Sequence, residues 1–231
     1  MSHSKQFTLF SHKTGPNGWK VVFVLNTLGL EYETVYLNFE EVKQPAHTQY
    51  NPNGRIPTLI DHANGDLVIW ESCAIILYLI ERYDPEHKIS VSDPNEKTQL
   101  VQWLFFQASG QGPYFGQVAY FKKLHPEKLP SVIVRYQDET RRILGVLESV
   151  LKQRPFLVGG KMTAADISFA IYNNLLYGKI LDEGFNFEKE FPCTFVWHQK
   201  IIALEGVKAG LSERQRMVEE EEKNLIAASS A

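Results

Sequence analysis

The sequence is poor in cysteine, with only Cys73 and Cys193 among its 231 residues. The two lie far apart, and neither belongs to a Cys-x-x-Cys motif. This spacing indicates neither a disulfide framework nor a zinc site, and we expect Cys73 to be a buried structural residue. If the protein carries out thiol chemistry, the thiol is therefore expected to belong to a ligand.

The sequence also lacks a marked excess of charge and any long apolar run. Its 24 Lys and Arg residues stand against 27 Asp and Glu, which gives a net charge of -3 and no electrostatic footprint for nucleic acid. No apolar segment approaches the roughly 20 residues of a membrane span, and the first residues carry no signal-peptide core. We expect a cytoplasmic protein with a small-molecule ligand, no nucleic-acid partner and no membrane partner.

The most informative stretch is residues 51–72, N-P-N-G-R-I-P-T-L-I-D-H-A-N-G-D-L-V-I-W-E-S. Asn64-Gly65 between two apolar runs predicts a tight hairpin with positive φ at both residues. Pro57 indicates an edge position or a cis bend, which leaves neighbouring backbone groups for a peptide. Ser72 follows Glu71 at the start of an apolar segment and predicts a helix start that binds an anion; the alternative is an ordinary N-cap serine.

The elements on either side of this stretch predict two domains. Strands are expected over 7–10 and 32–37, a helix over 19–28 that stops at Gly29, and a short helix within 38–50. With the hairpin and its helix, this is a thioredoxin-type arrangement over 1–84. A polar linker with two prolines covers 85–94.

The remaining residues, 95–231, are predicted to be all helical. Helices are expected over 95–110, 131–153, 191–204 and 206–226, with a break or kink at Gly110 to Pro113. Another helix begins at Thr163, where the spacing to Asp166 matches a capping box. We interpret Thr163 and Asp166 as structural residues.

The turn between the first strand and the first helix is the expected place for chemistry. It reads S-H-K-T-G-P-N-G over residues 11–18 and contains no cysteine, and no tyrosine precedes Tyr32. These absences exclude a Cys-x-x-Cys redox pair and a catalytic tyrosine in the turn. Ser11, Thr14 and Asn17 remain as candidate catalytic side chains.

Several motifs, in the right order, carry a resemblance to a known family. R-I-P-T-L, the hairpin and E-S opening a helix resemble the glutathione site of glutathione transferases. G-P-N-G-W-K resembles the turn of their fungal nitrogen-regulator-like and bacterial Nu-class subgroup, and similarity continues through W-L-F-F-Q-A-S-G-Q-G-P-Y-F-G-Q and R-Y-Q-D-E-T-R-R-I-L. The resemblance implies an α/β thioredoxin-like N-terminal domain followed by an all-α C-terminal domain, and a homodimer.

The resemblance also implies roles for individual residues. Asn17 would point its carboxamide at the glutathione sulfur, and Ile56, before a cis Pro57, would pair its backbone with the cysteinyl part. Glu71 and Ser72 would hold the γ-glutamyl end. Arg55 would lie close to glutathione and Arg135 would reach it from the helical domain, although an arginine is more often solvated or ion-paired.

Two departures from the subgroup limit what the resemblance implies. Gly15 replaces the threonine of the bacterial turn, so a second hydroxyl donor to sulfur could come only from Ser11 or Thr14. The chain begins close to its first strand, without the long Asn-rich extension of the yeast regulator. Nitrogen regulation is therefore not implied.

The expected function follows from a thiol that arrives with its ligand. Glutathione is expected as co-substrate, without a metal, and its bound thiolate would attack a disulfide or a peroxide. The alternatives are conjugation of glutathione to an electrophile, and a non-catalytic module that binds glutathione or a hydrophobic ligand. The sequence does not identify the second substrate.

Overall fold

The computed structural model describes residues 4–178 and 180–229, and its contacts divide the chain into two units. The first unit runs to Pro85 and resumes at Leu204, and the second is Glu86–Ala203. The first boundary falls beside the one expected from the sequence. Residues from Leu204 onward, which we expected in the helical domain, belong instead with the thioredoxin-like unit.

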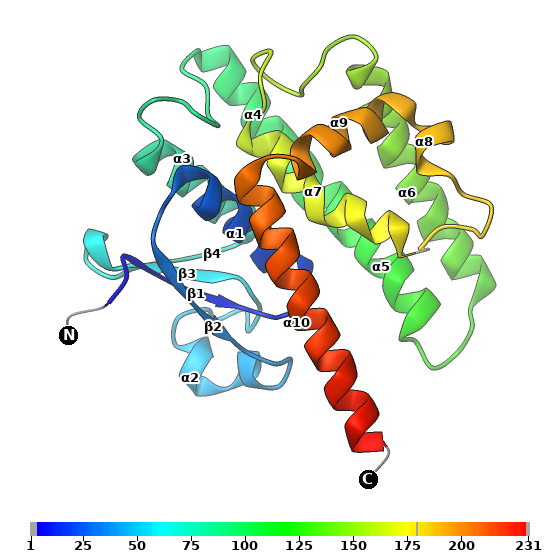
Figure 1. Ribbon diagram of the computed structural model, residues 1–231, viewed down its shortest axis with the longest axis horizontal. Coiled ribbons are helices and arrows are strands. Elements are labelled where there is room, and N and C mark those ends of the chain that lie inside the picture. Colours follow the sequence, from blue (N-terminus) through cyan, green and yellow to red (C-terminus); the bar gives the residue numbers. More distant parts are fainter. Residues whose placement is uncertain (1–3, 179, 230–231) are drawn as a thin grey trace. The chain divides into compact units, whose positions relative to one another are not determined.

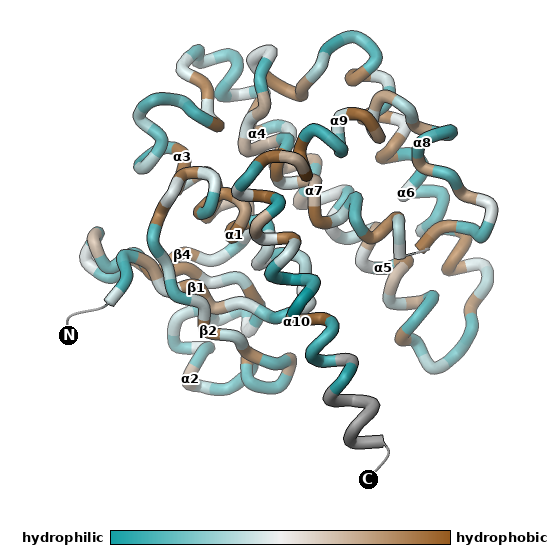
Figure 2. The backbone as a smooth tube through the Cα atoms, in the orientation of Figure 1, coloured by the Kyte–Doolittle hydropathy of each residue, from teal (hydrophilic) through white to brown (hydrophobic). Residues whose placement is uncertain are grey.

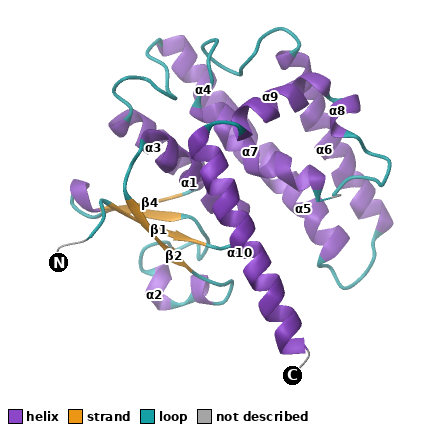
Figure 3. Cartoon of the chain, viewed as in Figure 1, coloured by secondary structure: helices purple, strands orange, loops and turns teal. Residues whose placement is uncertain are grey.

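A four-stranded sheet forms the centre of the first unit (Figures 1 and 3). Its strands are β1 (Phe7–Ser11), β2 (Tyr32–Tyr36), β3 (Thr58–Asp61) and β4 (Leu67–Trp70). They lie in the order β2-β1-β3-β4, with β1 parallel to β2 and antiparallel to β3. Helix α1 (Pro16–Leu28) makes the crossover between the parallel strands and ends at Gly29, whose φ is 70°. The predicted thioredoxin-like fold is confirmed.

The predicted hairpin turn is wrong in its details. A 3₁₀ turn, η2 (His62–Asn64), follows β3, and the positive φ angles lie at Gly65 (66°) and Asp66 (57°). The physical reason is the Asp61 side chain, which accepts a 2.9 Å hydrogen bond from the Ala63 N–H and starts the 3₁₀ turn. The turn is therefore one residue later than the Asn-Gly signal predicts.

Four helical segments complete the first unit: η1 (Glu41–Lys43), α2 (Pro45–Thr48), α3 (Ser72–Tyr83) and α10 (Glu205–Ser229). Helix α1 is buried along most of its length, including Trp19 and Phe23, and α10 packs along it. Asn26 donates to the Gly206 carbonyl at 3.2 Å. Helix α1 is largely apolar, whereas α10 is mostly polar after its first turns (Figure 2).

The second unit is helical, as predicted. Its elements are α4 (Pro94–Phe106), η3 (Gln107–Gln111), α5 (Gly112–Lys123), α6 (Pro130–Leu151), α7 (Ala164–Tyr177), α8 (Phe187–Glu190) and α9 (Pro192–Ile202). The expected kink near Gly110 is the π-helical turn η3. The sequence did not predict α5, because Gly112-Pro113 suggested an end; proline is in fact tolerated in a first helical turn.

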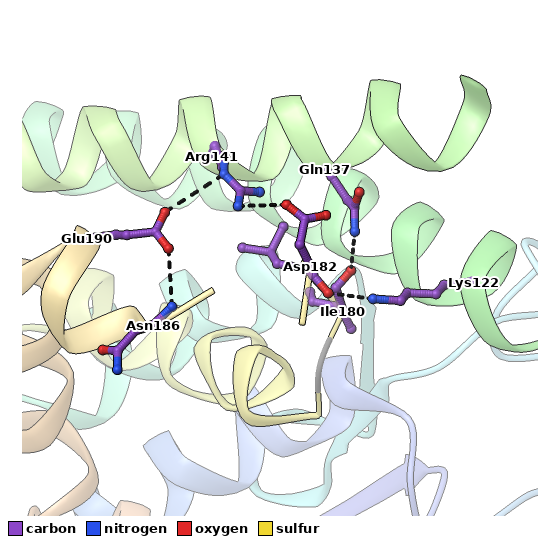
Figure 4. A network of polar contacts seen from close by, with 8 residues as sticks. Lys122, Gln137, Arg141, Ile180, Asp182, Asn186 and Glu190 are labelled. Carbon is purple, nitrogen blue, oxygen red and sulfur yellow. Dashed lines mark hydrogen bonds and ion pairs between the residues drawn. The ribbon is translucent and has the colours of Figure 1, made fainter. Parts of the chain in front are cut away.

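Polar anchors hold the second unit together. The Thr163–Asp166 capping box is present, and the buried Asp166 also accepts from Leu157 N–H at 2.9 Å and from Trp197 Nε1 at 2.8 Å, which confirms its structural role. The loop after α7 is tied to α5 and α6 (Figure 4). Three side chains of α5 and α6 contact this loop. Lys122 donates to the Leu181 carbonyl, Gln137 donates to the Ile180 carbonyl at 3.1 Å, and Arg141 donates to Asp182 at 2.9 Å.

A search of the described residues for membrane-spanning helices finds none with the length and hydropathy that crossing a membrane requires.

His198 on α9 predicts a pH dependence of stability. The imidazole is fully buried, its Nε2 lies 3.0 Å from Asn174 Oδ1, and burial lowers its pKa to about 4. The unfolded chain binds this proton below about 6.5 and the folded chain only below about 4, so stability is lost as the pH falls between these values. We expect the unfolding free energy of wild type, relative to His198→Gln, to fall by about 3 kcal/mol between pH 7 and pH 4. Urea unfolding of both proteins measures this, and parallel pH curves would contradict it.

Candidate functional site

The strand register brings the three predicted site segments to one edge of the sheet (Figure 1). Thr58 pairs with Phe10 on one side and with Trp70 on the other. The turn after β1, the Ile56-Pro57 bend before β3 and the Glu71-Ser72 step after β4 therefore lie next to one another. A Cβ placed on Gly15 would lie 3.5 Å from Ile56 Cδ1, so the turn and the bend are in direct contact.

Several hydrogen bonds fix the turn over residues 11–18. Nδ1 of His12 accepts from the backbone N–H of Thr14 at 3.1 Å and of Gly15 at 3.2 Å. Burial lowers the pKa of His12, which favours the neutral ring that this acceptor role requires. Arg214 of α10 donates to the Thr14 carbonyl at 2.8 Å. No local sequence pattern indicates this contact, because Arg214 lies 200 residues further along the chain than Thr14.

The three candidate catalytic side chains of the turn differ in their burial and contacts. Ser11 is 1% exposed, and its Oγ lies so close to α1 that a Cβ on Gly18 would be 1.9 Å from it. The Thr14 hydroxyl lies 3.2 Å from His12 Nδ1, within the turn. Asn17 is half-buried in the first turn of α1. Ser11 is therefore the least accessible of the three, whereas Thr14 and Asn17 are both half-buried, and a role of any of them toward a ligand stays a prediction.

A buried polar pair holds the Ile56-Pro57 bend, whose peptide bond is cis. Asn51 is 2% exposed and donates to the Arg55 carbonyl at 2.7 Å and to Thr58 Oγ1 at 3.0 Å. His47 Nε2 lies 3.2 Å from the same hydroxyl. Sequence reasoning missed both roles, although Asn51 opens the motif that signalled the site. The Arg55 side chain is exposed.

Glu71 has an unusual backbone conformation at the start of α3. It is the N-cap residue, with φ 71° and ψ 113°, and its side chain makes no capping hydrogen bond. A non-glycine residue in this region costs about 1–3 kcal/mol and often marks a functional site. Ser72 is the first residue of the helix and is 6% exposed. The alternative considered from the sequence, in which Ser72 is the N-cap residue, is therefore wrong, because Glu71 occupies that position. The exposed Glu71 carboxylate can thus bind a positive group, and the first N–H groups of α3 beside it can bind an anion.

Arg135 lies in the other unit, on α6. Its guanidinium is exposed and forms a 2.5 Å ion pair with Glu139, which also binds Arg142 at 2.7 Å. An ion-paired surface arginine is the structural alternative considered from the sequence, and a role of Arg135 toward glutathione stays a prediction. Among the described residues, no group of three or more metal-ligating side chains occurs.

Comparison with known proteins defines the family. The profile of the glutathione S-transferase N-terminal domain matches residues 5–81, and that of the C-terminal domain matches residues 113–205. The chain belongs to the glutathione transferase family, and it groups with the Ure2-like transferases of fungi. Glutathione S-transferase 1 of Schizosaccharomyces pombe is 50% identical over 93% of this chain and 99% of its own length.

Two crystal structures from Phanerochaete chrysosporium show the same fold. The glutathione transferase URE2P6, in complex with oxidized glutathione, has a TM-score of 0.90 and 53% identity over 94% of this chain and 100% of that one. Ure2p5, cocrystallized with 1-(S-glutathionyl)-2,4-dinitrobenzene, has a TM-score of 0.88 and 52% identity over 94% and 98%. The predicted family, subgroup and two-part architecture are confirmed.

The geometry at α3 predicts the consequence of removing one hydroxyl. Ser72 should bind the γ-glutamyl carboxylate of glutathione through its Oγ and backbone N–H. A hydrogen bond to a charged group is worth about 1.5–3 kcal/mol, so Ser72→Ala should weaken glutathione binding about tenfold or more in calorimetry. Unchanged affinity in a folded variant would remove the hydroxyl from the site.

Proposed function

We propose that this protein binds glutathione at the edge formed by residues 11–18, Ile56-Pro57 and Glu71-Ser72. Two of the three residues of the tripeptide meet matching groups. The Glu71 carboxylate and the N-terminus of α3 match the γ-glutamyl end, while the backbone of Ile56 and the Asn17 amide match the cysteinyl backbone and sulfur. The observation that carries the proposal is the meeting of these three segments at one sheet edge. The glutathione ligands of its close structural relatives support it.

The leading reaction is thiol–disulfide exchange with the bound glutathione as the thiol. The thiolate attacks the glutathionyl sulfur of a mixed disulfide, a new S–S bond forms oxidised glutathione, and the substrate thiolate leaves. Exchange favours a thiol whose pKa lies near the ambient pH, because a more acidic thiolate is a weaker nucleophile. A neutral amide such as Asn17 suits this need, since it stabilises the thiolate less than a positive charge does.

A hydroperoxide is the second substrate of the same class. The bound thiolate attacks the outer oxygen of the hydroperoxide, and the O–O bond breaks. The products are glutathione sulfenic acid and an alkoxide, which is the leaving group. A second glutathione condenses with the sulfenic acid to give the disulfide and water. Both reactions use glutathione as the reductant and require no cysteine of the protein, in keeping with a turn that contains none.

Conjugation is the alternative enzymatic function. It is favoured by the glutathione conjugate bound to Ure2p5, which is the product of attack on an aryl electrophile. A third candidate, a non-catalytic module that binds glutathione or a hydrophobic ligand, retains the same residues and differs only in the absence of turnover. We also propose a cytoplasmic homodimer, for which a light-scattering mass well above the 26.5 kDa of one chain is the test.

Side-by-side steady-state assays distinguish these functions. We expect the highest kcat/KM with a mixed disulfide of glutathione, a measurable rate with an organic hydroperoxide and the lowest with an aryl halide. A ranking led by the aryl halide would establish conjugation as the function. Binding of glutathione without turnover of any of the three substrates would favour the non-catalytic module.

Asn17→Ala should separate acidity from orientation. If the amide lowers the thiol pKa from about 8.5 to about 7, thiolate at pH 7 rises about fifteenfold while each thiolate becomes about fivefold less nucleophilic. Acidity alone then contributes about threefold, whereas positioning can contribute far more. We expect kcat/KM to fall about tenfold to a hundredfold, with a smaller change in glutathione affinity. Activity within about twofold of wild type, with an unshifted pH–rate profile, would transfer the role to Thr14 or Ser11.

A further inference from the structure

Lys20 is a buried ionisable side chain to which the functions above assign no role. It lies in the second turn of α1 and is 1% exposed, although lysine is almost never fully buried unless it is paired. Its Nζ lies 3.9 Å from Sγ of Cys73, the residue that directly follows Ser72 in α3. The amine is thus held beneath the first turn of α3.

An anion bound at the start of α3 would lie in the field of this buried amine. The N-terminus of a helix already carries partial positive charge, and a nearby ammonium adds to it. Burial lowers the pKa of Lys20, while the neighbouring Cys73 and Glu71 act in the opposite direction. Glu71 is exposed, so part of its field is lost to solvent. An anionic group bound at the start of α3 would add to the interactions that favour the ammonium.

The γ-glutamyl end of glutathione presents both charges on one carbon atom, a carboxylate and an ammonium. At α3 they meet groups of opposite sign at different depths: Lys20 and the helix N-terminus below, and the Glu71 carboxylate at the surface. We propose that Lys20 is a positioning residue, the buried positive charge that attracts the γ-glutamyl carboxylate to Ser72 while Glu71 holds the ammonium. The inference rests on the proposed binding of glutathione at this site.

The test separates the two charges of the ligand. S-methylglutathione is used as the reference probe, because it has no ionisable thiol and leaves the thiolate chemistry of Asn17 out of the measurement. The second probe is S-methyl glutaryl-Cys-Gly, which retains the carboxylate and lacks the ammonium. The third is S-methyl 4-aminobutanoyl-Cys-Gly, which retains the ammonium and lacks the carboxylate. Calorimetry with the full chain gives the affinity of each probe for wild type and variants.

Lys20→Met should weaken the two probes that carry the carboxylate about tenfold and change the third less than about twofold. Glu71→Gln should show the complementary pattern, with the loss confined to the probes that carry the ammonium. Lys20→Arg retains the charge and should recover part of the affinity. Lys5→Met removes a positive charge at the opposite end of β1, where Lys5 pairs with Glu31, and should leave all three affinities unchanged.

Equal weakening of all three probes by Lys20→Met would show that Lys20 only supports the fold, and no weakening would show that its charge is not used. Either result overturns the inference. If thermal melting shows that Lys20→Met is unfolded, the polar variant Lys20→Gln takes its place with the same expected pattern. Failure of wild type to bind S-methylglutathione would instead overturn the proposed function.

Discussion

The pairing of β3 with both β1 and β4 is the constraint on which the site depends. Thr58 lies between Phe10 and Trp70, so the residues just outside these positions in all three strands share one edge of the sheet. A shift of this register by one residue would turn the side chains of β3 to the opposite face. Asn51 and His47 hold the start of β3 in place, because both contact the Thr58 hydroxyl.

The same edge concentrates unfavourable features that a ligand can offset. Glu71 has a positive φ without being glycine, α3 begins without a side-chain cap, and Lys20 is buried beneath it. The first two of these features cost folding free energy. Their occurrence together at the start of α3 is therefore more readily explained by binding than by stability.

The sequence predicted those features that local chemistry determines. The helix stop at Gly29 and the capping box of Thr163 and Asp166 depend on residues near one another in the chain, and the structure agrees with them. Features set by distant partners were missed. The grouping of α10 with the first unit depends on packing against α1, and the Arg214 contact with Thr14 joins residues that no local pattern connects.

The hairpin and the start of α3 show how far local sequence patterns predict structure within residues 51–72. Asn64-Gly65 correctly indicated a turn, yet the Asp61 side chain moved the positive φ angles by one residue. Glu71-Ser72 correctly indicated a helix start, but the sequence could not show that Glu71 rather than Ser72 occupies the N-cap position. Motif order identifies a site, whereas the competition between a side chain and the backbone for one hydrogen bond decides its geometry.

We propose that this edge of the sheet holds glutathione with its sulfur beside Asn17 as a thiolate. Ultraviolet difference spectroscopy of the glutathione complex, titrated with pH, measures the thiolate directly. We expect the pKa of the bound thiol in wild type to lie near 7, well below about 8.5 for a free thiol, and Asn17→Ala to return it toward the free value. A bound thiol that titrates near its free pKa in wild type would show that Asn17 stabilises no thiolate at this site.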